Sequence, residues 1–192
     1  MPRLSLRVLG RLLAGVTVPL FAAACSSGTG LPAATQSNTV DTVSLYSLYD
    51  DTLPLDLPSG FDLLSNLAVR TDRTSGFDFA VNITPDGRAA FLPTYVLGLS
   101  RGAGFIHTNT PFGTILTAPV SGYQDSLPTV LDSGAVAIMR SRPVTCLTGS
   151  VLAYYGKMQI LAIDTTARRV DLEVLVDRNC GYHSLLSGVP SS

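Results

Sequence analysis

The feature that most constrains this sequence is a pair of alternating segments near its C-terminal end. Residues 157–164 read KMQILAID and residues 169–177 read RVDLEVLVD. In the second segment apolar and charged side chains alternate with period 2, which is typical of a strand with one buried and one solvated face. The polar link 165–168 is short enough to turn the chain back on itself, so we expect a β-hairpin. The predicted buried face consists of Val170, Leu172, Val174 and Val176, and the predicted solvated face of Arg169, Asp171, Glu173 and Asp177.

Two cysteines, Cys146 and Cys180, flank this hairpin, and the chain has one more, Cys25. If Cys25 is lipidated, as argued below, the other two remain as a pair, and an oxidising compartment favours a disulfide between them. Such a bond would stabilise the fold by about 3–4 kcal/mol. The alternative is a metal site, for which His183 is the nearest further ligand and a fourth is not evident. We predict a disulfide that clasps the open end of the hairpin, with Cα atoms less than about 7 Å apart.

The composition favours β-structure and argues against nucleic-acid binding. Lys157 and Glu173 are the only residues of their types, whereas Val, Thr, Ser and Gly abound. Strong helix formers for a helix surface are therefore nearly absent. Without the three N-terminal arginines, the 13 basic residues fall to 10 against 14 acidic ones, a net charge of −4. A mildly acidic chain with scattered arginines lacks the basic stripe that nucleic acids require.

Residues 1–24 have the organisation of a secretory signal peptide. Arg3, Arg7 and Arg11 precede an apolar run over residues 12–24, which ends in small side chains. The run is shorter than the roughly 20 residues that span a bilayer. A cleaved signal is therefore favoured over the alternative, a retained membrane anchor.

Cys25 follows three alanines in a pattern that resembles the bacterial lipobox, although Ala22 stands where Leu is usual. The resemblance implies that Cys25 is lipidated, becomes the first residue and anchors the chain to a membrane. Ordinary cleavage that leaves Cys25 as a free thiol is the alternative. Residues 25–39 are rich in Ser, Thr, Gly and Ala and predict a flexible tether. Because Asp does not follow Cys25, the resemblance implies the outer membrane or cell surface, with the domain in the periplasm or outside the cell.

Residues 40–192 predict a single β-domain. Pro85, Asp86 and Gly87 form a strong turn signal between two of its segments, and Ser59 with Asp62 is suited to cap one helical turn. Short strands with regular turn punctuation favour an all-β fold, an antiparallel β-sandwich or small barrel of about eight or nine strands. Besides the hairpin arms, the expected strands are 40–49, 67–71, 77–83, 89–97, 105–108, 114–118 and 135–140.

A serine hydrolase is suggested only by residues 98–102, GLSRG, which fit the G-x-S-x-G nucleophile elbow around Ser100. The elbow requires a strand-to-helix turn that exposes the hydroxyl beside a base. A strand is expected before Ser100, but Gly, Thr and Pro follow where the helix should be. A plain loop is therefore the favoured interpretation.

The two histidines, His107 and His183, are the candidate ligand residues. A hydrolytic zinc site normally uses two or three histidines with a carboxylate, and no H-E-x-x-H spacing is present. His107 is expected at a strand end as a hydrogen-bonded edge residue. His183 follows Cys180 closely, where packing on the loop is an equally good interpretation.

Residues 154–161, YYGKMQIL, resemble the C-terminal hairpin of HmuY-type lipoproteins, and residues 76–80, GFDFA, resemble an aromatic strand near the start of that family. Its members are exported all-β proteins that capture haem between two axial side chains. The resemblance implies haem or small-ligand capture. It does not identify the axial ligands, because His107, His183, Met139 and Met158 do not align with the ligand positions of that family. The chain also resembles uncharacterised exported lipoproteins of high-GC bacteria.

From these features we expect a membrane-anchored envelope lipoprotein with a non-catalytic binding or structural β-domain. The anchor, the tether and the lack of a convergent polar cluster favour this function. Its partners would be the membrane and an envelope protein or small ligand, with no resident cofactor unless haem is captured. The alternatives are the haem or small-ligand capture protein and, with least support, a hydrolase that uses Ser100.

Overall fold

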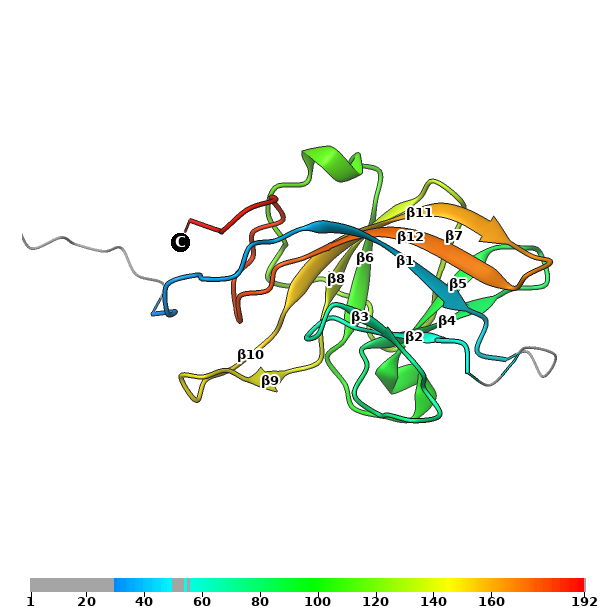
Figure 1. Ribbon diagram of the computed structural model, residues 1–192, viewed down its shortest axis with the longest axis horizontal. Coiled ribbons are helices and arrows are strands. Elements are labelled where there is room, and N and C mark those ends of the chain that lie inside the picture. Colours follow the sequence, from blue (N-terminus) through cyan, green and yellow to red (C-terminus); the bar gives the residue numbers. More distant parts are fainter. Residues whose placement is uncertain (1–29, 50–53, 55, 192) are drawn as a thin grey trace, which may run out of the picture.

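The computed structural model describes residues 30–49, 54 and 56–191, and these form an all-β sandwich of two five-stranded antiparallel sheets (Figure 1). The first sheet has the order β1 (Val40–Tyr46), β12 (Arg169–Val176), β11 (Tyr155–Asp164), β8 (Val136–Arg140) and β6 (Gly104–Thr108). The second has the order β3 (Leu67–Val69), β2 (Gly60–Asp62), β4 (Phe79–Ile83), β5 (Ala89–Pro93) and β7 (Thr129–Leu131). A small hairpin of β9 (Val144–Thr145) and β10 (Val151–Leu152) and two 3₁₀ turns, η1 (Thr94–Leu97) and η2 (Phe112–Thr114), complete the described elements.

The predicted hairpin is confirmed as β11 and β12, the longest paired strands of the first sheet. Their register shifts between Ile160 and Ala162, which marks a bulge near the turn. The four apolar side chains predicted on the inner face of β12 are at most 1% exposed. Alternation along one strand therefore identified the side of the first sheet that faces the core.

The core between the sheets is rich in phenylalanine. Phe79 lies at the centre, with ring centroids 5.6 Å from Phe61, 5.8 Å from Phe91 and 5.0 Å from Phe105. Phe105 belongs to the first sheet and the other three to the second, so these rings join the two layers. Tilted and edge-to-face pairs at these separations add to the stabilisation from burial alone.

The outer face of the first sheet is covered by loops, which the sequence did not predict. Residues 109–124 and 180–190 pack on it and form a second buried cluster. Leu175 is only 1% exposed there, although it occupies the face of β12 predicted to be solvated. The cluster consists of Phe112, Ile115, Ala118, Tyr123, Val136, Ile138, Tyr155, Leu175 and Leu185.

Lys157 attaches one of these covering loops to the sheet. Its ammonium donates to the carbonyl oxygens of Phe112 at 2.8 Å and Ile115 at 3.0 Å, and it lies 4.6 Å from the centre of the Phe112 ring. The side chain is buried, and this desolvation lowers the pKa of Lys157, although Glu173 opposes the shift. The lysine thus satisfies carbonyl groups at the end of η2 that would otherwise lack donors.

Several predicted elements differ from the structure. Residues 114–118 are not a strand, because their one pairing is an isolated bridge between Thr117 and Ser184. Ser59 does not cap a helical turn, because β2 follows it directly, but residues 63–66, which include the expected Leu63 and Leu64, do form a turn. Residues 94–97, expected to end a strand, form η1. The described chain contains twelve strands rather than eight or nine, because β2, β7, β9 and β10 were too short to show a period.

The predicted signal peptide 1–24 and Cys25 lie outside the described residues. Within residues 30–49, 54 and 56–191, no helix is both long and apolar enough to cross a membrane.

Candidate functional site

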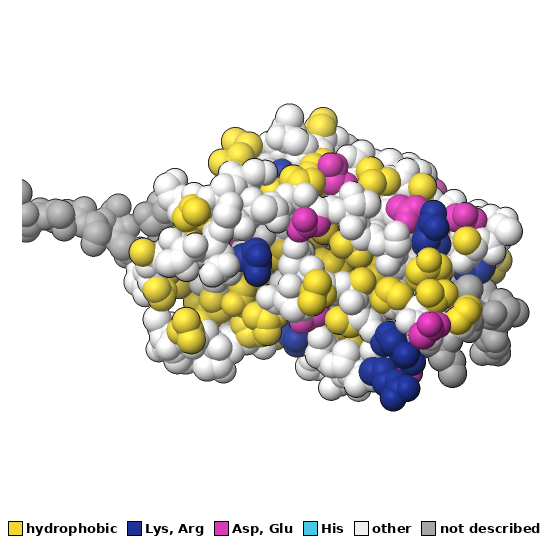
Figure 2. Space-filling model, viewed as in Figure 1, with side chains coloured by type: hydrophobic (Ala, Val, Ile, Leu, Met, Phe, Trp, Pro, Cys, Tyr) yellow, Lys and Arg dark blue, Asp and Glu magenta, His cyan; other side chains and the backbone are white. Residues whose placement is uncertain are grey.

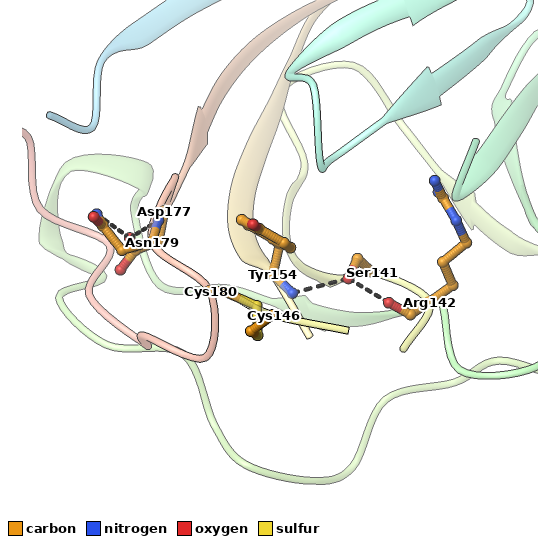
Figure 3. Close-up of a disulfide and its surroundings, with 7 residues drawn as sticks. All are labelled: Ser141, Arg142, Cys146, Tyr154, Asp177, Asn179 and Cys180. Carbon is orange, nitrogen blue, oxygen red and sulfur yellow. Dashed lines mark hydrogen bonds between the residues drawn. A yellow bond between two sulfur atoms is a disulfide. The ribbon is translucent and has the colours of Figure 1, made fainter. Parts of the chain in front are cut away.

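The candidate site is the end of the molecule that carries the disulfide, which we call the disulfide end. It comprises residues 31–38, the β9–β10 hairpin with Cys146, and residues 178–190 after β12 (Figure 1). Cys146 and Cys180 are bonded with Cα atoms 6.0 Å apart and 34 positions between them in sequence, which confirms the predicted clasp. The bond fastens the β9–β10 hairpin to the segment that leaves β12 (Figure 3), and it removes the metal alternative for these two sulfurs.

A buried polar network lies beneath the disulfide. Asp177 is fully buried, which corrects its predicted place on a solvated face. One carboxylate oxygen accepts from the backbone N–H and the side-chain amide of Asn179, both at 3.0 Å, and the other accepts from the N–H of Ser184 at 3.1 Å. Burial raises the pKa of the Asp177 carboxyl above its usual value, although these donors oppose the shift.

Asn179 connects this network to the N-terminal segment. Its carbonyl oxygen accepts from the N–H groups of Thr35 at 2.9 Å and Gln36 at 3.0 Å, and its amide donates to the Gln36 carbonyl at 2.9 Å. Asn38 pairs with Gly188 in an isolated bridge and accepts from the N–H of Arg178 at 3.1 Å. These contacts hold the segment against residues that are at least 140 positions away.

The start of the packed chain therefore precedes the predicted domain boundary at residue 40. The hydroxyl of Tyr182 donates to the carbonyl of Pro32 at 2.7 Å, so contact with the domain begins near residue 32. Of the predicted tether 25–39, residues 32–38 are bound to the domain by these hydrogen bonds, and residues 25–29 lie outside the described chain. This docking has no local signal in the sequence, because the partner residues Asn179 and Tyr182 lie far along the chain.

Two hollows adjoin at the disulfide end and share Tyr182 as a wall. The first, about 320 Å³, lies between residues 32–36, the β9–β10 hairpin and the disulfide, with Tyr154 also in its lining. The second, about 450 Å³, is lined by apolar side chains that include Leu31, Leu116 and Leu186, together with His183. Their sizes are in the range of small-molecule sites, and their linings are mostly apolar or neutral.

His183 is held firmly at the edge of the second hollow. Its Nδ1 lies 3.0 Å from the carbonyl oxygen of Ala118, and its ring stacks on Tyr155 with centroids 3.9 Å apart. Because a carbonyl only accepts, this contact assigns the proton to Nδ1 and leaves Nε2 with its lone pair in the neutral ring. A histidine oriented in this way is suited to accept a hydrogen bond or bind a metal through Nε2.

The structure does not bring His107 and His183 together. His107 is exposed on β6, two positions from Phe105, whose ring lies between the sheets. Residues two apart on a strand share a face, so His107 lies on the inner side of the first sheet, at its edge. His183 stacks on Tyr155 in the cluster on the outer side. The two histidines therefore lie on opposite sides of one sheet and do not form a pair of axial ligands.

The remaining haem-ligand candidates, Met139 and Met158, are both 0% exposed in the core between the sheets. Within the described residues, no group of three or more His, Cys, Asp or Glu side chains is placed to hold a metal ion.

Ser100 lies in an exposed loop that follows η1 and precedes β6. Its carbonyl oxygen accepts from the hydroxyl of Thr94 at 2.8 Å. The segment is thus a 3₁₀ turn followed by a loop and a strand, which is not the strand-to-helix turn of a nucleophile elbow. In the part of the chain that the structure describes, no hydrogen bond joins the Ser100 hydroxyl to His107 or His183.

A buried ion cluster joins the two sheets beside the disulfide end. The guanidinium of Arg142 lies 3.0 Å from carboxylate oxygens of both Asp62 and Asp78. Asp78, which is 0% exposed, also accepts from the N–H groups of Arg142 at 2.7 Å and Leu63 at 2.8 Å. Burial raises the pKa of Asp78 to about 6 against the effect of Arg142 and these donors. In the sequence, Asp78 is recognisable only by its alternation with phenylalanines, and no pattern indicates Arg142 as its partner.

Comparison with known proteins found no matching protein-family model and no significant match among curated proteins.

Proposed function

We propose that the chain is an exported lipoprotein, anchored through Cys25, whose β-sandwich acts in the cell envelope as a non-catalytic binding or structural domain. The observation that carries the proposal is the pairing of the cysteines. The bond between Cys146 and Cys180 leaves Cys25 as the one remaining cysteine of the three, at the predicted cleavage site. A structural disulfide is typical of oxidising compartments outside the cytoplasm.

The anchoring is tested by the mass of the processed protein purified from bacterial membranes. A chain that begins at Cys25 and carries diacylglycerol and acyl groups is the expected result. The Cys25→Ala variant serves as the control, because it keeps a small residue at the cleavage site but has no thiol to modify. An unmodified Cys25, or a chain that still contains residues 1–24, would contradict the proposal.

The proposed location is the outer membrane or the cell surface, with the domain in the periplasm or outside the cell. The support is that Ser26, rather than Asp, follows Cys25. Membrane fractionation of the Ser26→Asp variant tests the location, with Ser26→Thr as the control. We expect the Asp variant to move to the inner-membrane fraction while the control stays with the outer membrane. The same distribution for both variants would count against this sorting.

A second candidate function, capture of haem or another small ligand, is favoured by one observation. His183 borders the apolar hollow of about 450 Å³ with its Nδ1 already engaged by Ala118. A haemin titration tests it by absorption, because iron ligation by Nε2 would give a sharp Soret band. We expect His183→Ala to abolish that band and His107→Ala to leave it unchanged. A featureless spectrum with the unaltered protein would remove this candidate.

A further inference from the structure

Charge is distributed unevenly along the chain. Four stretches, residues 30–40, 109–124, 143–156 and 179–191, contain no Asp, Glu, Lys or Arg. Each of the four is close to a segment of another, although they are far apart in sequence. Residues 35–36 bind Asn179, Thr117 pairs with Ser184, and the disulfide joins Cys146 to Cys180. The fold therefore gathers the uncharged stretches in one region, which consists of the disulfide end and the adjoining loop of residues 109–124.

The space-filling view shows the same asymmetry (Figure 2). Acidic and basic side chains gather toward the opposite end, whereas white and yellow atoms dominate the surface where the described chain begins. The ion pairs near the surface of the described residues, Arg70–Asp72, Arg73–Asp72, Arg88–Asp132 and Arg169–Asp171, lie outside the four stretches. Arg178 is the one exposed charge of the described disulfide end, where it lines the first hollow, and Asp177 and Lys157 are buried nearby.

Large apolar side chains project from this uncharged surface. Leu147, at the tip of the β9–β10 hairpin, is as exposed as in an unfolded chain, at 106%. Leu147 lines the first hollow, and Leu31, Leu116 and Leu186 line the second hollow beside it. Single exposed leucines are common, but a group of them on a surface without charges marks an interaction site. The exposed members of the group are Leu116 (54%), Val120 (76%), Leu147, Val151 (65%), Leu186 (50%) and Val189 (58%).

The anchor brings this surface close to a membrane. Five residue steps separate Cys25 from Gly30, where the described chain begins. Even fully extended, five residues span at most about 18 Å. From residue 32 onward the chain is bound to the disulfide end through Tyr182 and Asn179. A lipid inserted at Cys25 therefore holds this end, and no other, next to the bilayer surface.

We propose that the uncharged disulfide end rests on the lipid surface, with the side chains of Leu147, Val151 and Leu116 in the headgroup region. The inference rests on the proposed lipidation of Cys25. The bilayer is favoured over a second copy or another protein because the short anchor places this surface beside lipid before any partner arrives. Transfer of leucine and valine into the interface is favourable, and the lack of charged groups removes the main cost of approach.

The inference also predicts an unusual insensitivity to salt. Peripheral proteins that bind anionic lipid through lysine and arginine lose affinity as salt screens them. The described disulfide end exposes a single basic residue, Arg178, and no basic cluster, so its contact depends mainly on apolar side chains. Binding should therefore be the same on neutral vesicles and on vesicles with anionic lipid.

The test is amide hydrogen exchange of the lipidated, processed protein in vesicles of phosphatidylethanolamine and phosphatidylglycerol. The reference is the processed Cys25→Ser chain free in solution. We expect exchange to slow at least fivefold in residues 116–121 and 145–151 and to stay unchanged in residues 161–168, at the opposite end. Equal exchange at both ends would overturn the inference, because the domain would then stand away from the bilayer.

Matched variants identify the side chains responsible. Leu147→Asp introduces a charge at a fully exposed position, so the fold should persist, and we expect it to abolish the slowing in residues 145–151. Leu161→Asp is the control, because Leu161 is also exposed (48%) but lies near the β11–β12 turn. Protection that survives Leu147→Asp would contradict the proposed contact.

Failure of the anchor and failure of the contact are distinguishable. If the mass shows no lipid on Cys25, the anchoring proposal fails, and cosedimentation of the Cys25→Ser chain with the same vesicles still tests the surface. We expect that binding to fall about tenfold in Leu147→Asp and to be independent of salt. Slower amide exchange that appears without vesicles and increases with protein concentration would instead show contact between copies of the protein. That result would overturn the inference.

Discussion

The two ends of the sandwich are built in different ways. At the turn end, β4 and β5 are joined through Gly87, and β11 and β12 through residues 165–168, so each link connects neighbours in sequence. These two turns lie against each other, since a Cβ on Gly87 would be 3.4 Å from the Thr165 methyl group. At the disulfide end, three segments that are distant in sequence meet, and a covalent bond and buried amides hold them.

The turn end is therefore stabilised by contacts between neighbours in sequence, and the disulfide end by contacts between distant segments. Ion pairs at the turn end, such as Arg88–Asp132, are exposed and contribute little to stability. The disulfide end depends on groups that are buried and specific, so the loss of one partner leaves another unsatisfied. We therefore expect single substitutions at or next to the disulfide end, the end proposed to contact the membrane, to lower the free energy of unfolding most. Four changes test this contrast.

The largest effect is expected for Arg142→Ala, in the buried ion cluster that lies next to the disulfide end. The change leaves the buried carboxylates of Asp62 and Asp78 without their guanidinium, which costs about 3–5 kcal/mol in cases of this kind. Arg88→Ala is the matched control at the turn end and should cost less than about 1 kcal/mol. Urea unfolding of both variants measures the difference. Similar losses for the two would show that the ends do not differ in this way.

Removal of the disulfide is expected to have the next largest effect. The double variant Cys146→Ala and Cys180→Ala should lower the free energy of unfolding by about 3–4 kcal/mol, because the 34-residue separation sets the entropy of the closed loop. Denaturant unfolding with and without reductant provides the measurement. The unaltered protein under reducing conditions should match the double variant, and a stability indifferent to reductant would refute this role.

The pH dependence of stability should report on Asp78. Its folded pKa of about 6 lies above the ordinary value of 3.8, so the folded state favours the protonated carboxyl. The contribution is fully present below pH 4 and is lost as the pH rises to about 6, by an amount on the order of 2–3 kcal/mol. The comparison is the free energy of unfolding of the unaltered protein minus that of Asp78→Asn, measured from pH 3.5 to 7. A difference that stays constant over this range would contradict the assignment.

A smaller effect is expected for Asn179→Ala. The substitution leaves the N–H groups of Thr35 and Gln36 without their acceptor, at a cost of about 1–3 kcal/mol. Residues 31–38 should also detach, which limited proteolysis at this segment would detect. Asn109→Ala, in an exposed loop, is the control and should leave both stability and cleavage unchanged. An intact segment in the Asn179 variant would show that other contacts suffice to hold it.

The sequence predicted those parts of the fold that depend on local pattern. Alternation over residues 169–176 identified a strand and its buried face, and the turn signal at Gly87 identified a hairpin. Cysteine counting identified the Cys146–Cys180 bond, because pairing needs only two thiols and an oxidising compartment. These features depend on neighbouring residues or on composition, so no knowledge of tertiary contacts was needed.

The remaining features depend on contacts between distant segments. Asp177 continues the alternation of β12 and was placed on the solvated face, yet residues from both chain ends bury it. The pairing of Arg142 with Asp78 spans 64 positions, and β2 and β7 have three residues each, too few to show a period. The positions of His107 and His183 on opposite sides of one sheet likewise follow from long-range packing, because His183 lies in a loop that stacks on Tyr155. None of these contacts leaves a local signal in the sequence.

Neutron reflectometry of the lipidated protein on a supported bilayer would test the proposed membrane contact directly. If the disulfide end touches the lipid, protein density will continue from the headgroups without a water layer. Leu147→Asp should introduce a gap, and Leu161→Asp should not. A hydrated layer of about 10 Å or more beneath the unaltered domain would contradict the claim that the uncharged end is built to face the membrane.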